Sequence, residues 1–166
     1  MLAAWRGSGP DGSHFEAAAK KSGRTEHWRE ALHLFWEASN ERVKHSQSFY
    51  VSTISAFRKG QQWQWALSLL SELVASTVEA SVMIYNAGIS ACDRGRQWKR
   101  ALSLLSQMVE TKLEPTVISY SAVISACGKG RQWQWALSLL SQMVETKLEP
   151  DTIIYNAAIS ACEKVL

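Results

Sequence analysis

A period of 35 residues runs through most of the chain and limits what it can fold into. Four tryptophans, at 28, 63, 98 and 133, are each 35 residues apart. Tyrosine at 50, 85, 120 and 155 and glycine at 60, 95 and 130 keep the same spacing. Residues 82–116 and 117–151 differ at only nine of 35 positions. A fixed period of this length indicates a stacked array rather than a globule with one closed core.

Within one period the apolar residues follow a helical spacing in two segments. In 82–94, Tyr85, Ile89 and Cys92 stand at i, i+4 and i+7, and the pattern stops at Gly95. In 97–110 a broad apolar stripe begins at Trp98. The following segment ends in Pro115, which cannot continue a helix. Each unit is therefore predicted to be a hairpin of two helices, which we call helix A and helix B.

The period divides the chain into one solenoid domain with several units. We expect an N-terminal tail at 1–11, a degenerate first repeat at 12–46, repeats at 47–81, 82–116 and 117–151, and a partial fifth at 152–166. The fifth contains only helix A. It is either a cap or the point where a longer array is cut, and we favour a fragment because 152–162 copies an internal repeat, whereas a cap should carry a polar outer face.

Composition excludes several functional classes. The hydrophobic fraction of 46% and the charged fraction of 20% are typical of a folded chain, and serines interrupt every apolar run, so we expect no membrane span. The three cysteines occur once per repeat, at 92, 127 and 162, without Cys-x-x-Cys or paired histidine, so they are predicted to be small core residues. We expect no metal, no cofactor and no catalysis, because no catalytic constellation or phosphate loop is present.

The repeat resembles a known family once several columns are taken together. The segment 117–130, Val-Ile-Ser-Tyr-Ser-Ala-Val-Ile-Ser-Ala-Cys-Gly-Lys-Gly, and the unit ending Leu-Glu-Pro-Asp at 148–151 closely resemble the pentatricopeptide repeat, in its plain 35-residue P-type. The resemblance covers 47–166 and, more weakly, 12–46. It implies an all-α fold, a right-handed α-solenoid of helix-turn-helix hairpins. It also implies that the chain binds single-stranded RNA, one base per repeat. The implied role is in organellar RNA processing, stability, editing or translation, and the implied location is a mitochondrion or chloroplast.

The resemblance assigns base reading to two positions of each repeat. These are the residue after the helix A tyrosine and the last residue of the repeat: Asn86 with Thr116, Ser121 with Asp151, and Asn156 without a visible partner. Amide, hydroxyl and carboxylate groups can meet the Watson–Crick edge of a base. The implied sequence is 5′-pyrimidine, G, pyrimidine. The first two repeats carry Glu16 with Ser46 and Val51 with Ser81, and we expect little specificity from them.

Two further columns complete the predicted site. Met83, Ile118 and Ile153 stand where the family sandwiches each base, while Ser48 departs from that pattern. The net charge is only +3, but basic residues recur at one position of the repeat, the end of helix A. These residues are predicted to contact phosphate: Lys59, Arg94, Lys129 and Lys164. The same cations could instead complement the helix dipole.

Two alternatives stay open at this stage. The polar residues at the base-reading positions could simply cap or solvate helix A. The array could also be a protein-interaction scaffold of the tetratricopeptide kind, although that family has a 34-residue period and a different grouping of its aromatic residues. Other proteins or further repeats of a longer chain are therefore additional expected partners.

Overall fold

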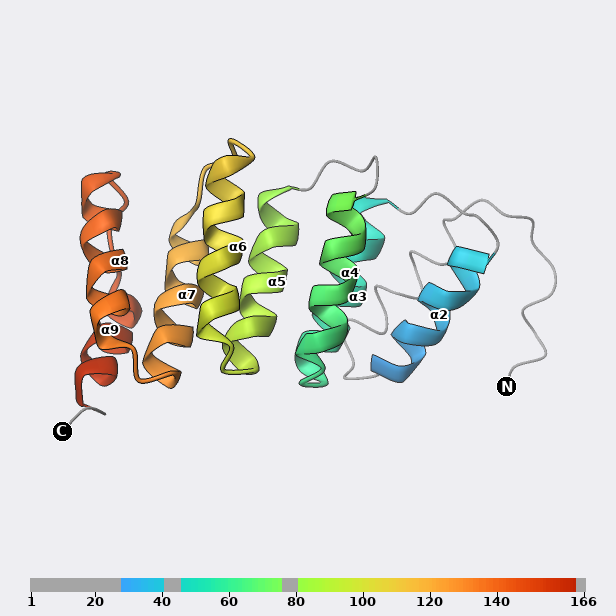
Figure 1. The fold of residues 1–166 in the computed structure, drawn as a ribbon, viewed down its shortest axis with the longest axis horizontal. Helices are drawn as coiled ribbons and strands as arrows, with labels where there is room; N and C mark the ends of the chain where they lie inside the picture. Colours follow the sequence, from blue (N-terminus) through green and yellow to red (C-terminus); the bar gives the residue numbers. More distant parts are fainter. Residues whose placement is uncertain (1–27, 41–45, 76–80, 164–166) are drawn as a thin grey trace.

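The fold is an open stack of α-helices. The computed structural model describes residues 28–40, 46–75 and 81–163. In these ranges the elements are α2 (Trp28–Asn40), α3 (Gln47–Lys59), α4 (Trp63–Ala75), α5 (Val82–Arg94), α6 (Trp98–Glu110), α7 (Val117–Lys129), α8 (Trp133–Glu145) and α9 (Thr152–Glu163), with no strand. Figure 1 shows these helices side by side in chain order. The predicted all-α solenoid is confirmed, and helix A of the first repeat lies outside the described residues.

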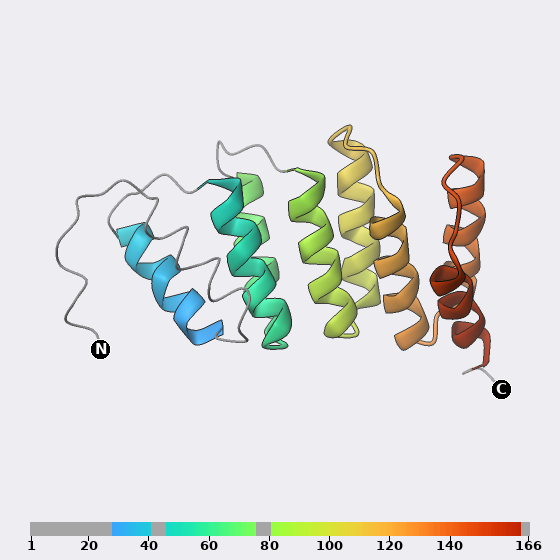
Figure 2. The ribbon, with the colours of Figure 1, turned by 180° about the vertical axis from the view of Figure 1, so that it is seen from behind.

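The helices form two rows. The predicted helices at 82–94 and 97–110 correspond to α5 and α6 within one residue. Figure 1 shows α4, α6 and α8 on the near side of the array, and Figure 2, from behind, shows α3, α5, α7 and α9 in front. No helix in the described ranges is both long and apolar enough to cross a membrane.

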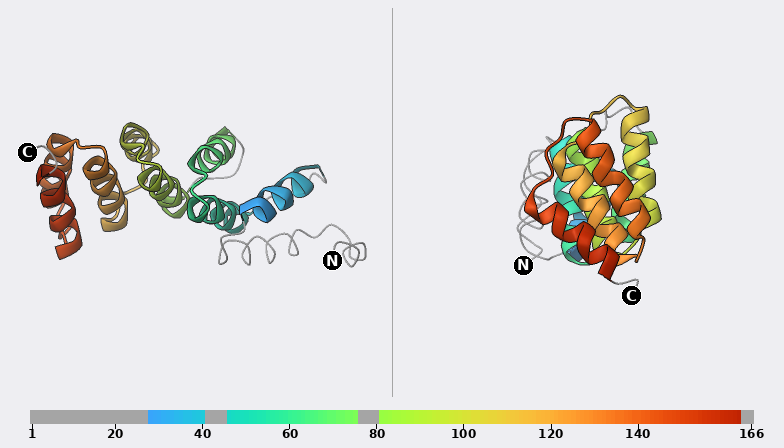
Figure 3. Two further views of the ribbon diagram at one scale, coloured as in Figure 1. Left: turned by 90° about the horizontal axis from the view of Figure 1, so that it is seen from below. Right: turned by 90° about the vertical axis from the view of Figure 1, so that its left-hand side faces the viewer.

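Contacts between helices give the array its curvature. Helix α3 contacts α5, α5 contacts α7, and α7 contacts α9. In the part of the chain that the structure describes, α4, α6 and α8 contact the helices of the other row but not one another. A row whose members touch is shorter than a row whose members are separated, so we call α3, α5, α7 and α9 the inner row and α4, α6 and α8 the outer row. Figure 3 shows the stack from below and end-on.

The periodic apolar residues form one continuous core. Tyr85, Ile89 and Cys92 of α5 are at most 1% exposed, and the corresponding residues of α7 are at most 3% exposed. On the B helices, the alanines at 66, 101 and 136 are fully buried. The tryptophans at 28, 63, 98 and 133 are partly buried and pack on this core, while Trp65 and Trp135 are half-exposed. The core is therefore built between hairpins as well as within them.

Each of three helix B tryptophans lies against a glycine of the following hairpin. Trp28 faces Gly60, Trp63 faces Gly95, and Trp98 faces Gly130. A Cβ atom added to Gly130 would lie 2.9 Å from Cγ and 3.2 Å from Nε1 of Trp98. The tryptophan and glycine columns of the sequence are thus the two halves of one contact between successive units.

The backbone does not require these glycines. Gly60, Gly95 and Gly130 end their helices with φ angles of −76°, −79° and −84°, which any residue can adopt. The left-handed conformation falls on the next residue, which is Gln61, Arg96 or Arg131, with φ of 58°, 56° and 57°. The glycines are therefore explained by lack of space beside the indole rings, rather than by a turn that needs positive φ.

We predict that Gly130→Ala destabilises the array through Trp98. An added methyl group that forces a packed ring to shift costs about 1–3 kcal/mol. The free energy of unfolding in urea, followed by circular dichroism, measures this loss. Trp98→Ala removes the obstructing ring, so in that background Gly130→Ala should cost much less. An equal cost in both backgrounds would contradict the proposed cause.

Burial also sets the reactivity of the cysteines. Cys92 and Cys127 are fully buried, whereas Cys162 is partly exposed. Desolvation raises the pKa of Cys92 to about 12 and that of Cys127 to about 11. Since only the thiolate reacts, a thiol with a pKa near 11 is only about one-thousandth ionised at pH 8.

We predict that a thiol-specific disulfide reagent at pH 8 modifies Cys162 and leaves Cys92 and Cys127 unmodified in the folded chain. Peptide mapping of the modified protein identifies the sites. In urea the same chain should react at all three cysteines and release three equivalents of the thiol that leaves the reagent. This control shows that the reagent is active and that the cysteines were not already oxidised. Rapid modification of Cys127 before unfolding would show that the core is open there.

Candidate nucleic-acid interface

The last residue of each repeat doubles as the N-cap of the next inner-row helix. Ser46 precedes α3, Thr116 precedes α7 and Asp151 precedes α9, and the backbone of Ser46 and of Thr116 is extended, as is usual for an N-cap. The Ser46 hydroxyl accepts a hydrogen bond from the Phe49 amide at 3.2 Å, and Asp151 Oδ1 accepts one from the Ile154 amide at 2.9 Å. Capping by these residues, one of the alternatives open from the sequence, is therefore present. It leaves other polar atoms for a ligand.

Asn86 and Thr116, which are 30 residues apart in sequence, meet in the structure. Asn86 Nδ2 lies 3.5 Å from Thr116 Oγ1, within hydrogen-bonding distance. Ser119 of α7 joins them: its hydroxyl donates to Asn86 Oδ1 at 2.6 Å and accepts from the Thr116 amide at 3.0 Å. Asn86 and Thr116 remain partly exposed, whereas Ser119 is fully buried. The third repeat thus presents a connected group of amide and hydroxyl atoms.

The fourth repeat is arranged differently. Ser121 is partly exposed on α7, and Asp151 is exposed where α9 begins. Asp151 Oδ1 caps α9, and the structure gives its Oδ2 no partner in the described ranges. Asn156 is exposed on α9. A hydroxyl and an open carboxylate oxygen are hydrogen-bonding groups that a ligand could use.

The apolar column beside these residues faces solvent. Met83 and Ile118 are each 64% exposed, and Ile153 is 70% exposed. Each stands three residues before Asn86, Ser121 or Asn156 on the same helix, so it lies one turn away on the same face. The inner row therefore alternates exposed apolar side chains with small polar ones, a surface that could hold flat rings with polar edges.

The basic column is uneven. Lys129 Nζ lies 2.6 Å from Asp93 Oδ2 of the preceding hairpin and 3.5 Å from the Asp93 carbonyl oxygen. The side chains of Lys129 and Asp93 are 39% and 18% exposed. The other carboxylate oxygen, Oδ1, is buried and has no hydrogen-bond partner. Much of the charge of Lys129 is therefore neutralised within the protein.

One hairpin earlier, the same pair of positions holds two cations. Arg58 and Arg94 are 36 residues apart, as Asp93 and Lys129 are. Burial, together with the positive charge of Arg94 nearby, lowers the pKa of Arg58. Arg94 is exposed and has no ion-pair partner among the residues described. Positive charge is thus concentrated near the ends of α3 and α5. Lys59 is partly exposed, and Lys164 lies outside the described residues.

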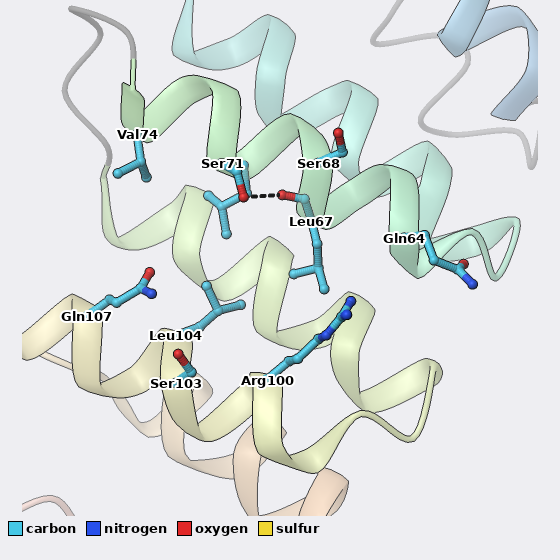
Figure 4. Close-up of a pocket in the computed structure, with 10 residues that line it drawn as sticks. Gln64, Leu67, Ser68, Ser71, Val74, Arg100, Ser103, Leu104 and Gln107 are labelled. Carbon is cyan, nitrogen blue, oxygen red and sulfur yellow. Dashed lines mark hydrogen bonds between the residues drawn. The ribbon is translucent and has the colours of Figure 1, made fainter.

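A separate hollow of about 680 Å³ lies in the outer row, between α4 and α6 (Figure 4). Leu67, Leu104 and Arg100 line the space between the two helices, and the Ser71 hydroxyl donates to the Leu67 carbonyl at 3.0 Å. The Arg100 guanidinium carbon lies 4.7 Å from the centre of the Trp63 ring. This hollow belongs to the row opposite Asn86 and Ser121, so it is not part of the predicted base-reading surface.

Two residues that make contacts at this interface were not predicted from the sequence. In the repeats that the structure describes, Ser119 is the polar member of a column whose other members are Phe49, Ile84 and Ile154, all at most 1% exposed. Asp93 stands in a column with Arg58, Gly128 and Glu163, where the charge changes from repeat to repeat. In both cases the departure from the column was the available signal. In the described ranges no cluster of three or more histidine, cysteine or acidic residues could hold a metal ion.

Comparisons with known proteins agree with this geometry. A family model described as pentatricopeptide repeat domain matches residues 68–130, and one described as PPR repeat matches 118–147. No curated protein matches the chain. Among solved structures, the pentatricopeptide repeat protein PPR10 from maize superposes with a TM-score of 0.80 at 20% identity, over 94% of this chain and 22% of that one.

Two further structures were determined with RNA. PPR10 in complex with an 18-nt psaJ RNA element gives a TM-score of 0.77 at 21% identity, over 94% of this chain and 23% of that one. The PPR domain of Arabidopsis thaliana protein-only RNase P 1, in complex with tRNA, gives a TM-score of 0.80 at 15% identity, over 92% of this chain and 80% of that one. The chain thus spans less than a quarter of the length of PPR10. The matched models show that residues 68–147 consist of pentatricopeptide repeats, and the period and the two rows of helices agree with that family.

Proposed function

We propose that this pentatricopeptide repeat array binds single-stranded RNA along its inner row, one base per repeat, without catalysing a reaction itself. The observation that carries the proposal is the meeting of Asn86 and Thr116, since the fold brings together two polar residues that the family pattern pairs. Solved relatives in complex with RNA support the same conclusion. The match of the period and of the family models favours this function over a tetratricopeptide-like protein scaffold.

The proposed repeat boundaries are 12–46, 47–81, 82–116, 117–151 and 152–166. The base-reading groups are Asn86 with Thr116, Ser121 with Asp151, and Asn156; Met83, Ile118 and Ile153 would sandwich the bases. The sequence read is 5′-pyrimidine, G, pyrimidine. An organellar role in RNA processing, stability, editing or translation, in a mitochondrion or chloroplast, is part of the proposal. With so few reading repeats, affinity is expected to be weak and to fall steeply with salt.

Electrophoretic mobility shift at low salt tests the function directly. The purified chain should retard a single-stranded RNA that contains pyrimidine-G-pyrimidine more strongly than the same RNA with adenine at these three positions. A duplex of the same sequence serves as a control, because its bases are paired and stacked. No retardation of either single strand at low salt would refute RNA binding.

We predict that Ser121→Asn changes the base preferred by the fourth repeat from guanine to a pyrimidine. Asparagine already occupies the same column at Asn86 and Asn156, so the substitution copies a side chain that the array accommodates. Loss of a well-made base contact is worth about 1–3 kcal/mol of discrimination. Binding to RNAs that vary only at that nucleotide measures the change. The preference at the nucleotide of the third repeat should stay as it is.

We predict that Arg94→Met lowers RNA affinity more than Lys129→Met does. Arg94 is exposed and without an ion-pair partner in the described chain, whereas Lys129 is engaged by Asp93. Losing one phosphate contact should reduce the slope of log affinity against log salt by about one. Titrations at several salt concentrations measure that slope. Lys99→Met is the matched control, since it removes the same charge from α6 of the outer row, and an equal effect of all three variants would indicate non-specific attraction only.

A further inference from the structure

A hydroxyl from the following repeat contacts both residues that are proposed to read the base of the third repeat. Ser119 is fully buried, yet both of its hydrogen-bonding functions are used toward that site. Its oxygen accepts the Thr116 amide at 3.0 Å, and its hydrogen is donated to Asn86 Oδ1 at 2.6 Å. A separation of 2.6 Å is typical of an O–H···O bond and short for an N–H···O bond, which favours the amide oxygen of Asn86 facing Ser119.

This bond determines what Asn86 can offer to a ligand. Because Oδ1 is turned toward the buried hydroxyl, Nδ2 lies on the side of Thr116, 3.5 Å from its Oγ1. The amide nitrogen has two hydrogens, of which one points to Thr116, so the second is left as a donor. Pyrimidines and purines alike have an acceptor on the Watson–Crick edge, so the position in which this donor is held decides which base can bring its acceptor to it.

We propose that Ser119 is a positioning residue for Asn86: it fixes the orientation of the amide and thereby the base preference of the third repeat. The inference rests on the proposed RNA-binding function. The fourth repeat has no such third member, because the residue in the corresponding place is Ile154, which is fully buried and has no side-chain hydrogen-bonding group. The third and fourth repeats therefore read their bases with different numbers of residues.

Ser119→Thr and Ser119→Val form a matched pair that isolates the hydroxyl. They have nearly the same shape, and the column already accommodates the larger Ile84 and Ile154 in fully buried positions. Threonine keeps the hydroxyl and should keep the preference for a pyrimidine at the third-repeat nucleotide. Valine removes the hydroxyl and frees the Asn86 side-chain amide to rotate. The preference for a pyrimidine over the other bases at this nucleotide should then fall by about two- to tenfold, which is the usual contribution of one hydrogen bond.

The adjacent nucleotide provides the internal control. Ser119 lies two residues from Ser121 on α7, so general damage to this helix would also weaken the guanine preference of the fourth repeat. Binding of each variant is measured with RNAs that carry each of the four bases at either nucleotide. The inference is supported if Ser119→Val loses selectivity only at the third-repeat nucleotide while Ser119→Thr does not.

Three other results would overturn it. Unchanged selectivity in Ser119→Val would show that Asn86 needs no positioning, and loss of selectivity at both nucleotides would show a merely structural role. Failure of the unmodified chain to bind any RNA would instead refute the proposed function, and this inference with it. A side-chain amide NMR spectrum adds a readout without RNA: the Asn86 resonances should move in Ser119→Val and stay near their original positions in Ser119→Thr.

Discussion

The array depends on contact between units, because no single hairpin can bury its own apolar residues. The clearest form of this contact is the indole of one helix B against the glycine that ends the next helix A. A side chain at that glycine would push the hairpins apart, and loss of the ring would leave a gap. The contact recurs at the same step along the chain, so each hairpin is placed on its neighbour in the same way, and stability is approximately a sum over neighbouring pairs.

That regular placement creates the candidate interface. Because each inner-row helix packs on the next, the residue that ends one repeat lies where the next helix begins, close to the polar residue of the preceding helix. Asn86 and Thr116 meet for this reason. The candidate interface is therefore distributed over the junctions between hairpins, and the Ser119 contact shows that a junction can join side chains from both hairpins.

Periodicity predicted the repeat unit and the helices well, since apolar spacing, proline and glycine are local signals that act within one hairpin. It also identified the polar residues that the structure places on the inner row. It could not predict that Lys129 would be paired while Arg94 would not, because that difference depends on which residue, Asp93 or Arg58, the neighbouring unit presents. It could not reveal the purpose of Gly95 and Gly130, since a glycine needed for space and one needed for a turn are identical in sequence.

The continuous inner row also has a consequence for the geometry of any bound strand. Packed helices are separated by about 8–10 Å, whereas successive nucleotides in a stacked strand rise by only about 3.4 Å. In an RNA that advances one nucleotide per hairpin, the distance between successive nucleotides is therefore more than twice that in a stacked strand. Its bases then lose contact with one another. Met83, Ile118 and Ile153, exposed at the same interval, are suited to replace those lost stacking partners, so the protein would hold its ligand under extension rather than in its relaxed form.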